Sequence, residues 1–356
     1  MNCTSALPAD AALNTLLLPF ATGALIWPST ADVLFMRARA GAALGSIATD
    51  RLVCQQSFKP FADALLEMGL TVAEPDEQKC PLGLLLPPRQ REESRALLAR
   101  ALQRVEPGGT VVASALNNEG ARSAEGDLER LAGSVRSLSK NKCRVFWATA
   151  TAQAMNTDLI TAWATLDAPQ RIADGRFLSR PGLFSWTRID RASALLARCL
   201  PANLAGCGAD LGAGFGYLAA EVLARCPGVS ALDLYEAEAR GLDLTRSNLK
   251  GDAQRNERAP VALSFFWHDV TSGLDKPQHY DFIVSNPPFH QGRADQPEIG
   301  CAFIIAAAAA LRSGGCLWLV ANRHLPYEQV LRANFRKVRT VAEEHGFKVI
   351  EAIKGR

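Results

Sequence analysis

Along the second half of the chain, stretches with the apolar pattern of a strand alternate with stretches that have the apolar pattern of a helix. Short apolar runs typical of buried strands lie at 206–213, 229–236, 262–269, 280–286 and 315–322. Stretches with the spacing of an amphipathic helix lie between them, at 217–225, 239–249 and 299–311. Strands that alternate with helices form a mostly parallel, doubly wound sheet, so this half predicts an α/β fold.

The C-terminal stretch, residues 335–354, has a different pattern. Two apolar runs there flank the dipeptide His345-Gly346, which is typical of a tight turn. This pattern predicts a hairpin that adds antiparallel strands at one edge of the sheet.

The first half resembles a worn copy of the second. Residues 83–117 and 281–323 each read as an apolar strand, Pro-Pro, a helix, Gly-Gly, a second strand and Asn. The copies differ before and after Pro-Pro, where Leu86 stands for Asn286 and Arg89 for Phe289, and the first half has no Gly-rich turn. We interpret the similarity as a duplication in which the first copy kept the fold and lost the site. Chance is the alternative, because strand–helix–strand patterns are common.

This interpretation divides the chain into three parts. Residues 1–166 are predicted to form a degenerate domain that supports the other and helps to position a ligand. Residues 167–190 read as a loop-like linker, and residues 191–356 as the catalytic domain.

Composition narrows the class of protein without identifying it. The chain has 356 residues, of which 48% are hydrophobic and 21% charged, with a net charge of +3. No apolar run reaches the roughly 18 residues of a membrane span, and the N-terminal stretch lacks the features of a secretion signal. The nine cysteines include no CxxC pair, which argues against zinc and disulfides and favours the cytoplasm.

A Gly-rich turn spans 209–218, between the first predicted strand of this half and a helix. Glycines allow backbone torsions and close approach that other side chains block. Gly212, Gly214 and Gly216 give the spacing GxGxG, whereas the dinucleotide fingerprint is GxGxxG. An acidic residue, Glu236, closes the next strand and could accept hydrogen bonds from both hydroxyls of a ribose. The alternative for Glu236 is a surface position at a strand end.

The third strand ends in His268-Asp269. The Asp269 carboxylate could accept a hydrogen bond from an adenine amino group. The alternative is an Asp that caps a turn or a helix. For His268 we expect a structural or stacking role and not a catalytic one.

The fourth strand ends in Asn286-Pro287-Pro288-Phe289. An exocyclic amine on a nucleobase is a poor nucleophile, because its lone pair is delocalised into the ring. Two acceptors, the Asn286 side-chain oxygen and the Pro287 carbonyl, could take both of its hydrogens and aim the lone pair at a methyl donor. The prolines would fix the backbone, and Phe289 would offer a face for stacking. The sequence therefore predicts amine methylation without a metal.

Together these motifs resemble class I S-adenosylmethionine-dependent methyltransferases that act on amino nitrogens. The duplicated halves and the stretches PGLFSWTRID and NRHLPYE make the chain similar to the RsmC/RlmG type of ribosomal RNA guanine-N2 methyltransferase. The resemblance implies two tandem Rossmann-like domains and Asn286, Pro287, Pro288 and Phe289 as the catalytic set that holds guanine. It implies that the cofactor is held by Asp210, Gly212, Ala213, Gly214, Gly216, Glu236, His268, Asp269 and Asn286.

The same resemblance implies a monomeric cytoplasmic enzyme, with 16S ribosomal RNA in the assembled 30S subunit as its substrate and no membrane partner. Three basic stretches are candidates for RNA contact, namely 136–144, 332–339 and the arginines of 89–104. The 23S RNA is the near alternative, followed by adenine N6 or a glutamine amide. A dehydrogenase would leave Asn-Pro-Pro-Phe unexplained, and a non-catalytic RNA-binding relic would not need Asn286.

Overall fold

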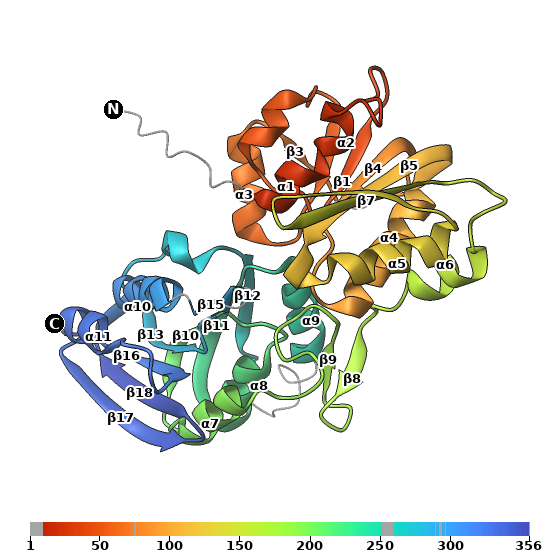
Figure 1. The fold of residues 1–356 in the computed structure, drawn as a ribbon. Helices are drawn as coiled ribbons and strands as arrows, with labels where there is room; N and C mark the ends of the chain where they lie inside the picture. Colours follow the sequence, from red (N-terminus) through yellow and green to blue (C-terminus); the bar gives the residue numbers. More distant parts are fainter. Residues whose placement is uncertain are drawn as a thin grey trace, which may run out of the picture. The chain divides into compact units, whose positions relative to one another are not determined.

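Two compact α/β units make up the chain (Figure 1). The computed structural model describes residues 10–74, 76–250, 260–288, 290–291, 294–295 and 297–355. The N-terminal unit is Met1–Ala168 and the C-terminal unit is Pro169–Arg356. Within the described residues, no helix combines the length and the apolar character needed to cross a membrane.

The C-terminal unit is built on a seven-stranded sheet in the order β12-β11-β10-β13-β16-β18-β17. Its first five strands run parallel, which confirms the predicted doubly wound fold. The strands are β10 (Ala205–Leu211), β11 (Gly228–Glu236), β12 (Ala262–Trp267), β13 (Tyr280–Ser285), β16 (Leu311–Asn322), β17 (Lys337–Glu344) and β18 (Phe347–Ile353). The helices are α7 (Arg191–Cys199), α8 (Tyr217–Arg225), α9 (Ala239–Leu249), α10 (Pro297–Ala310) and α11 (Glu328–Asn334).

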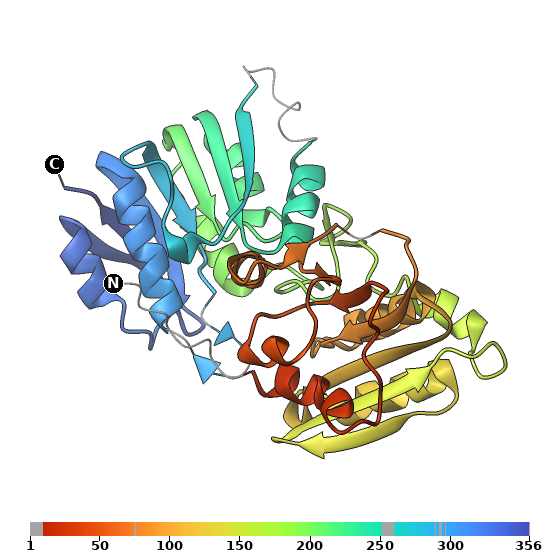
Figure 2. The ribbon, with the colours of Figure 1, turned by 90° about the horizontal axis from the view of Figure 1, so that it is seen from above.

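Helices cover both faces of this sheet, as the view from above shows (Figure 2). Successive residues of a strand point to opposite faces. Phe282 and Val284 of β13 pack with helices α7, α8 and α9, whereas Ile283 packs with α10 and α11. Because both faces are buried, the strands read as continuous apolar runs, and this made them visible in the sequence.

The C-terminal hairpin is confirmed. Strand β18 pairs antiparallel with both β16 and β17, so the two last strands extend the sheet at one edge. His345 and Gly346 both have positive φ, at 52° and 83°, which is the conformation of a two-residue hairpin turn.

The N-terminal unit repeats this topology strand for strand, in the order β3-β2-β1-β4-β5-β7-β6. Its strands are β1 (Val33–Met36), β2 (Leu52–Gln55), β3 (Thr71–Val72), β4 (Cys80–Leu85), β5 (Val105–Leu116), β6 (Arg136–Lys140) and β7 (Cys143–Thr149). Its helices are α1 (Ala11–Leu16), α2 (Leu18–Ala21), α3 (Lys59–Glu67), α4 (Arg91–Arg104), α5 (Ala121–Ala132) and α6 (Thr157–Trp163). The tandem arrangement predicted from the sequence is therefore present.

Strands β5 and β16 show the repeat in detail. Both have 12 residues and the same pattern of buried and exposed positions. Each begins with a register shift against its parallel neighbour, β4 or β13. Gly108 and Gly314 lie at the same place with φ of 83° and 79°. A shared irregularity of this kind supports duplication more strongly than the strand order alone.

The expected linker, 167–190, does not stand apart: residues 167–168 cluster with the N-terminal unit and residues 169–190 with the C-terminal unit. They contain a short hairpin of β8 (Gln170–Ile172) and β9 (Phe177–Ser179). The side chain of Asn248 on α9 holds this hairpin, because it accepts from the Leu178 N–H at 2.7 Å and donates to the Leu178 carbonyl at 2.9 Å. These contacts give the segment a packing role that its loop-like composition did not reveal.

Shorter elements complete the chain. They are the 3₁₀ turns η1 (Ala42–Ser46), η2 (Asn117–Glu119) and η3 (Val270–Ser272) and the small strands β14 (His290–Gln291) and β15 (Ala294–Asp295).

Candidate active site

A pocket lies at the carboxyl ends of β10 and β13. Residues from the stretch before α7, from the start of α7, from the Gly-rich turn and from the end of β13 line it: Phe184, Ser185, Asp190, Ser193, Gly212, Ala213, Gly214, Phe215, Tyr217, Leu218 and Asn286. Four of the predicted site residues thus share one pocket, namely Gly212, Ala213, Gly214 and Asn286. This is the edge of a parallel sheet at which ligands of doubly wound folds bind.

The Gly-rich turn needs its glycines. Gly212, Gly214 and Gly216 have φ of 77°, 60° and 90°, all in the region that favours glycine. A Cβ on Gly216 would lie 2.9 Å from the Cγ2 atom of Thr245 on α9. The Thr245 hydroxyl in turn donates to the Gly214 carbonyl at 2.9 Å. The turn is therefore clamped onto α9, with Gly216 as the residue that precedes α8.

Glu236 ends β11 and is joined to the same turn. Its carboxylate accepts the N–H of Gly214 at 2.7 Å and the N–H of Glu238 at 2.8 Å. Burial raises the pKa of Glu236, and these two backbone donors partly oppose the rise. A carboxylate has further lone pairs beyond these two bonds, so the ribose role stays a prediction that this geometry permits.

Asp210 is fully buried beneath the turn, at 0% exposure. Neither of its carboxylate oxygens has a hydrogen bond of ordinary length and angle among the described residues, although the backbone N–H of Ala219 lies near enough to act on its charge. Burial raises the pKa of Asp210 to about 7; the backbone N–H of Ala219 partly opposes the rise, and the Glu236 charge adds a smaller increase. A buried carboxylate without a hydrogen bond of ordinary geometry destabilises a fold, so this one indicates a site for a cation or a donor.

His268 and Asp269 lie outside the pocket-lining set. His268 shares a 2.6 Å hydrogen bond between its Nε2 and the Gly273 carbonyl, which supports the structural role expected for it. Oδ1 of Asp269 accepts the N–H and the hydroxyl of Thr271, at 2.9 and 2.7 Å, and so caps η3. Capping was the alternative for Asp269, and its adenine contact stays a prediction.

Asn286 follows β13 directly. Its strand is tied to the Gly-rich turn, because the Ser285 hydroxyl donates to the Leu211 carbonyl at 2.8 Å. The Asn286 amide nitrogen donates to Oδ2 of Asp190 at 3.0 Å and to Oγ of Ser193 at 2.8 Å. Pro287 is buried and Pro288 is exposed. Phe289, the predicted stacking residue, lies outside the described residues.

Among the pocket-lining residues that the sequence did not single out as site residues, Phe184, Asp190 and Ser193 are the most informative. Asp190 and Ser193 belong to the start of α7, where Asp190 accepts the Ser193 N–H at 2.8 Å and caps the helix. The signal was available, since an Asp directly before an apolar helical run is a typical N-cap. Phe184 borders the pocket with 62% of its surface exposed, which is unusual for a large apolar side chain. It lies beside Ser185, whose φ is 50°.

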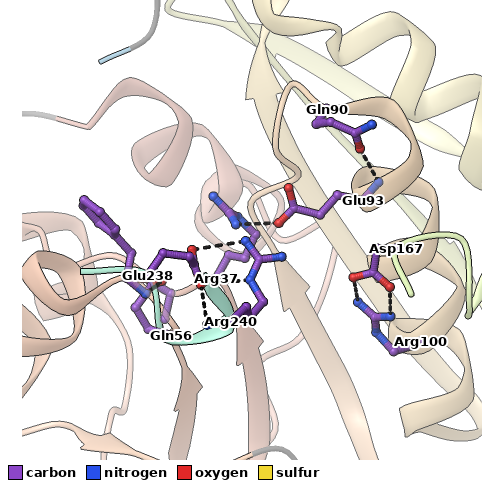
Figure 3. A network of polar contacts seen from close by, with 10 residues as sticks. Arg37, Gln56, Gln90, Glu93, Arg100, Asp167, Glu238 and Arg240 are labelled. Carbon is purple, nitrogen blue, oxygen red and sulfur yellow. Dashed lines mark hydrogen bonds and ion pairs between the residues drawn. The ribbon is translucent and has the colours of Figure 1, made fainter. Parts of the chain in front are cut away.

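The arginines of α4, expected as one of three candidates for RNA contact, make ion pairs inside their own unit. Arg100 forms two hydrogen bonds to Asp167, at 2.7 and 2.9 Å (Figure 3). Arg95 likewise donates two hydrogen bonds to the Asp127 carboxylate, at 2.9 and 3.0 Å. Both acids are buried, so these arginines stabilise the N-terminal unit.

Comparison with known proteins finds methyltransferases. The family described as the methyltransferase small domain matches residues 174–351. A ribosomal RNA large subunit methyltransferase G from Pseudomonas syringae pv. tomato is 33% identical, over 73% of this chain and 68% of its own. A ribosomal RNA small subunit methyltransferase C from Psychromonas ingrahamii is 27% identical, over 87% of this chain and 88% of its own.

One solved structure resembles both units together. It is a T. thermophilus 16S rRNA N2 G1207 methyltransferase, RsmC, in complex with AdoMet and guanosine. It matches with a TM-score of 0.78 and 23% identity, over 98% of this chain and 93% of its own. The likeness shows that the tandem fold is shared.

Proposed function

The chain belongs to the methyltransferase small-domain family, and we propose that it transfers a methyl group from S-adenosylmethionine to the exocyclic N2 of a guanine in 16S ribosomal RNA. The predicted methyltransferase activity is confirmed by this membership. One observation carries the choice of an amine as the target: Asn286 and the Gly-rich turn line the same pocket. A methyl donor on the turn and an amine held at Asn286 would therefore be neighbours.

The residues present fit the proposed cofactor. S-adenosylmethionine supplies a methyl group on a positively charged sulfur, next to an ammonium and a carboxylate. The buried carboxylate of Asp210 would give the positive part a counter-charge. Backbone at Gly212 and Gly214 has no side chains to block close approach, and Glu236, at the end of the adjacent strand, would accept hydrogen bonds from the ribose.

The target amine would be held at Asn286 and Pro287. The Asn286 oxygen and the Pro287 carbonyl would accept the two hydrogens of N2, which concentrates the lone pair on nitrogen and directs it at the methyl group. After transfer the nitrogen loses a proton readily, so a strong base at the site is unnecessary. The guanine would have to leave its helix or be unpaired, because its N2 edge is otherwise occupied.

The substrate follows from the relatives' names. Several proteins named ribosomal RNA small subunit methyltransferase C match this chain over most of its length. They support ribosomal RNA as the class of substrate. The assembled 30S subunit, the cytoplasm and a monomeric enzyme are further parts of the proposal. The N-terminal unit would support the catalytic unit and help to position RNA. The relative from Pseudomonas syringae pv. tomato favours 23S RNA as the second candidate.

The test uses S-adenosylmethionine labelled in its methyl group, with bacterial 30S subunits, 50S subunits and naked ribosomal RNAs as acceptors. Digestion to nucleosides and mass spectrometry then identify the product. The proposal expects N2-methylguanosine from 30S subunits. The same nucleoside from 50S subunits alone would keep the chemistry and change the substrate. N6-methyladenosine, or no labelled nucleoside, would contradict the guanine target.

A further inference from the structure

The side-chain amide of Asn286 is held in one orientation by the start of α7. Its Nδ2 lies 3.0 Å from Oδ2 of Asp190 and 2.8 Å from Oγ of Ser193. An ionised carboxylate only accepts hydrogen bonds, so the NH₂ end of the amide must be the end that faces Asp190. The oxygen end, Oδ1, is thereby turned away from Asp190 and kept for another donor.

We infer that Asp190 and Ser193 are positioning residues, which present the Asn286 oxygen and not its NH₂ group to the amine of the substrate. This rests on the proposed function, in which that amine offers two hydrogens. With the amide reversed, the Asn286 NH₂ group would face the N–H groups of the substrate amine, and the hydrogen bond that holds the amine would be lost. A charged acceptor on the amide nitrogen also polarises the amide, which makes its oxygen a stronger acceptor.

Asp190 and Asn286 are both held by well-packed parts of the C-terminal unit. Asp190 caps α7 by accepting the Ser193 N–H at 2.8 Å, and α7 buries Leu195 and Leu196 in the core. Asn286 directly follows Ser285, which is buried and bonded to β10. The orientation of the amide is therefore established before a substrate binds, as preorganised catalysis requires.

The N-terminal unit contains the same cap without the amide. Asp10 caps α1 by accepting the N–H groups of Ala12 and Leu13, at 2.9 and 3.0 Å. Leu13, three residues after Asp10, occupies the position that Ser193 has in the C-terminal unit. Leu86, directly after β4, occupies the position of Asn286. The two leucines are buried in one apolar cluster.

The C-terminal unit thus has both the Ser193 hydroxyl and the Asn286 amide, and the N-terminal unit has neither. The capping Asp is present in both units. In the N-terminal unit the second oxygen of Asp10 pairs with Arg39 at 2.9 Å. The cap explains why an Asp stands at both positions. It does not explain Ser193 or Asn286, and their hydrogen bonds are specific to the unit with the pocket.

The experiment compares Asp190→Ala and Asp190→Asn with Asp10→Ala as the matched control. It measures kcat and KM on the ribosomal substrate, the dissociation constant of S-adenosylmethionine by calorimetry, and Tm. Asp190→Ala should lower kcat about tenfold or more, with the cofactor dissociation constant unchanged. Asp190→Asn keeps an oxygen acceptor and should restore most of the rate. Asp10→Ala loses an equivalent cap and should lower Tm by a similar amount with kcat unchanged.

A double variant separates positioning from folding. If Asp190 acts through Asn286, Asp190→Ala should lower kcat no further in an Asn286→Ala background. Multiplied losses in the double variant would overturn the inference, as would an unchanged kcat in Asp190→Ala. Should Asp190→Ala fail to fold, Ser193→Ala, which keeps the cap, is tested in the same cycle. Absence of guanine methylation by the wild-type protein would overturn the proposed function itself, which is a different result.

Discussion

The two sheets agree in their frameworks and differ where their parallel strands end. The register aligns them, because Met36 pairs with Leu85 as Leu211 pairs with Ser285. By this alignment Phe35 stands for Asp210, and Arg37 for Gly212. The buried charge beneath the turn has thus become an aromatic ring at 0% exposure. Removing the site removed a group that burial destabilises and left the fold in place.

Parts of the old backbone geometry survive without their original residues. Arg37 has a φ of 52°, close to the 77° of Gly212, although a non-glycine residue is strained there. Gln56 stands for Glu236 and keeps one of its bonds, since its side-chain oxygen accepts the N–H two residues on, at 2.9 Å against 2.8 Å. Its amide nitrogen donates to the Ala38 carbonyl at 2.7 Å. The turn was kept for folding, and the charge, which folding does not need, was lost.

The largest expected effect comes from making the C-terminal unit resemble the N-terminal one. Asn286→Leu copies Leu86 and removes the acceptor for the target amine. We expect kcat to fall by about 10²–10³-fold, as for the loss of one preorganised hydrogen-bonding group. Calorimetry should show S-adenosylmethionine binding nearly as tightly as to the wild type. Retained turnover would mean that the amine is not held at Asn286.

The reverse comparison truncates Leu86, the counterpart of Asn286. Leu86 is 1% exposed, so Leu86→Ala should open a cavity and lower the free energy of unfolding by about 2–5 kcal/mol. Below the unfolding transition kcat should equal that of the wild type. Urea unfolding and the methylation assay measure the two effects. A loss of rate in a fully folded Leu86→Ala protein would give the N-terminal unit a part in chemistry.

Asp210→Asn sharpens the contrast with Phe35. Burial raises the pKa of Asp210 from 3.8 to about 7, so between these values the folded protein holds a proton that the unfolded chain has released. The free energy of unfolding then falls as pH rises through this window, by at most about 1.4 kcal/mol per pH unit. Asp210→Asn should remove this contribution and stabilise the ligand-free protein at pH 7.5.

Urea unfolding of both proteins from pH 4 to 8 provides the measurement for Asp210. Calorimetry at pH 7.5 provides its functional complement, because the variant should bind S-adenosylmethionine more weakly. Equal slopes for the two proteins would show that Asp210 is ionised throughout and has a partner that holds its charge.

The smallest expected effect is on stability, and it separates the cost of a positive φ in a non-glycine residue from the cost of a steric clash with a neighbouring side chain. Gly216 and Gly120 precede α8 and α5 with nearly the same φ, 90° and 93°. A Cβ at Gly120 would meet nothing within 4 Å, whereas one at Gly216 would lie 2.9 Å from Thr245. Gly120→Ala should cost about 1 kcal/mol from backbone strain alone. Gly216→Ala should cost about 1 kcal/mol more. Equal losses in thermal unfolding would show that Thr245 yields without penalty.

Much of the fold could be predicted from local pattern. The helices expected at 217–225 and 239–249 are α8 and α9, because an apolar stripe at helical spacing is a local signal. The hairpin β8–β9 was not predicted, since its anchors are distant in the sequence: Asn248, about 70 residues from Leu178, and Glu221, which pairs with Arg176. In α4, the sequence could not show that buried Asp127 and Asp167 engage the arginines.

The sequence by itself determined the doubly wound sheet, the tandem repeat and the polar residues that close each strand, because apolar periodicity and turn chemistry act over a few residues. Only the tertiary structure decided which of those residues meet. Asp190 reaches Asn286 from 96 residues away because α7 packs against the sheet beside the end of β13. Only it decided that Asp210 is buried, since burial depends on what packs around a side chain.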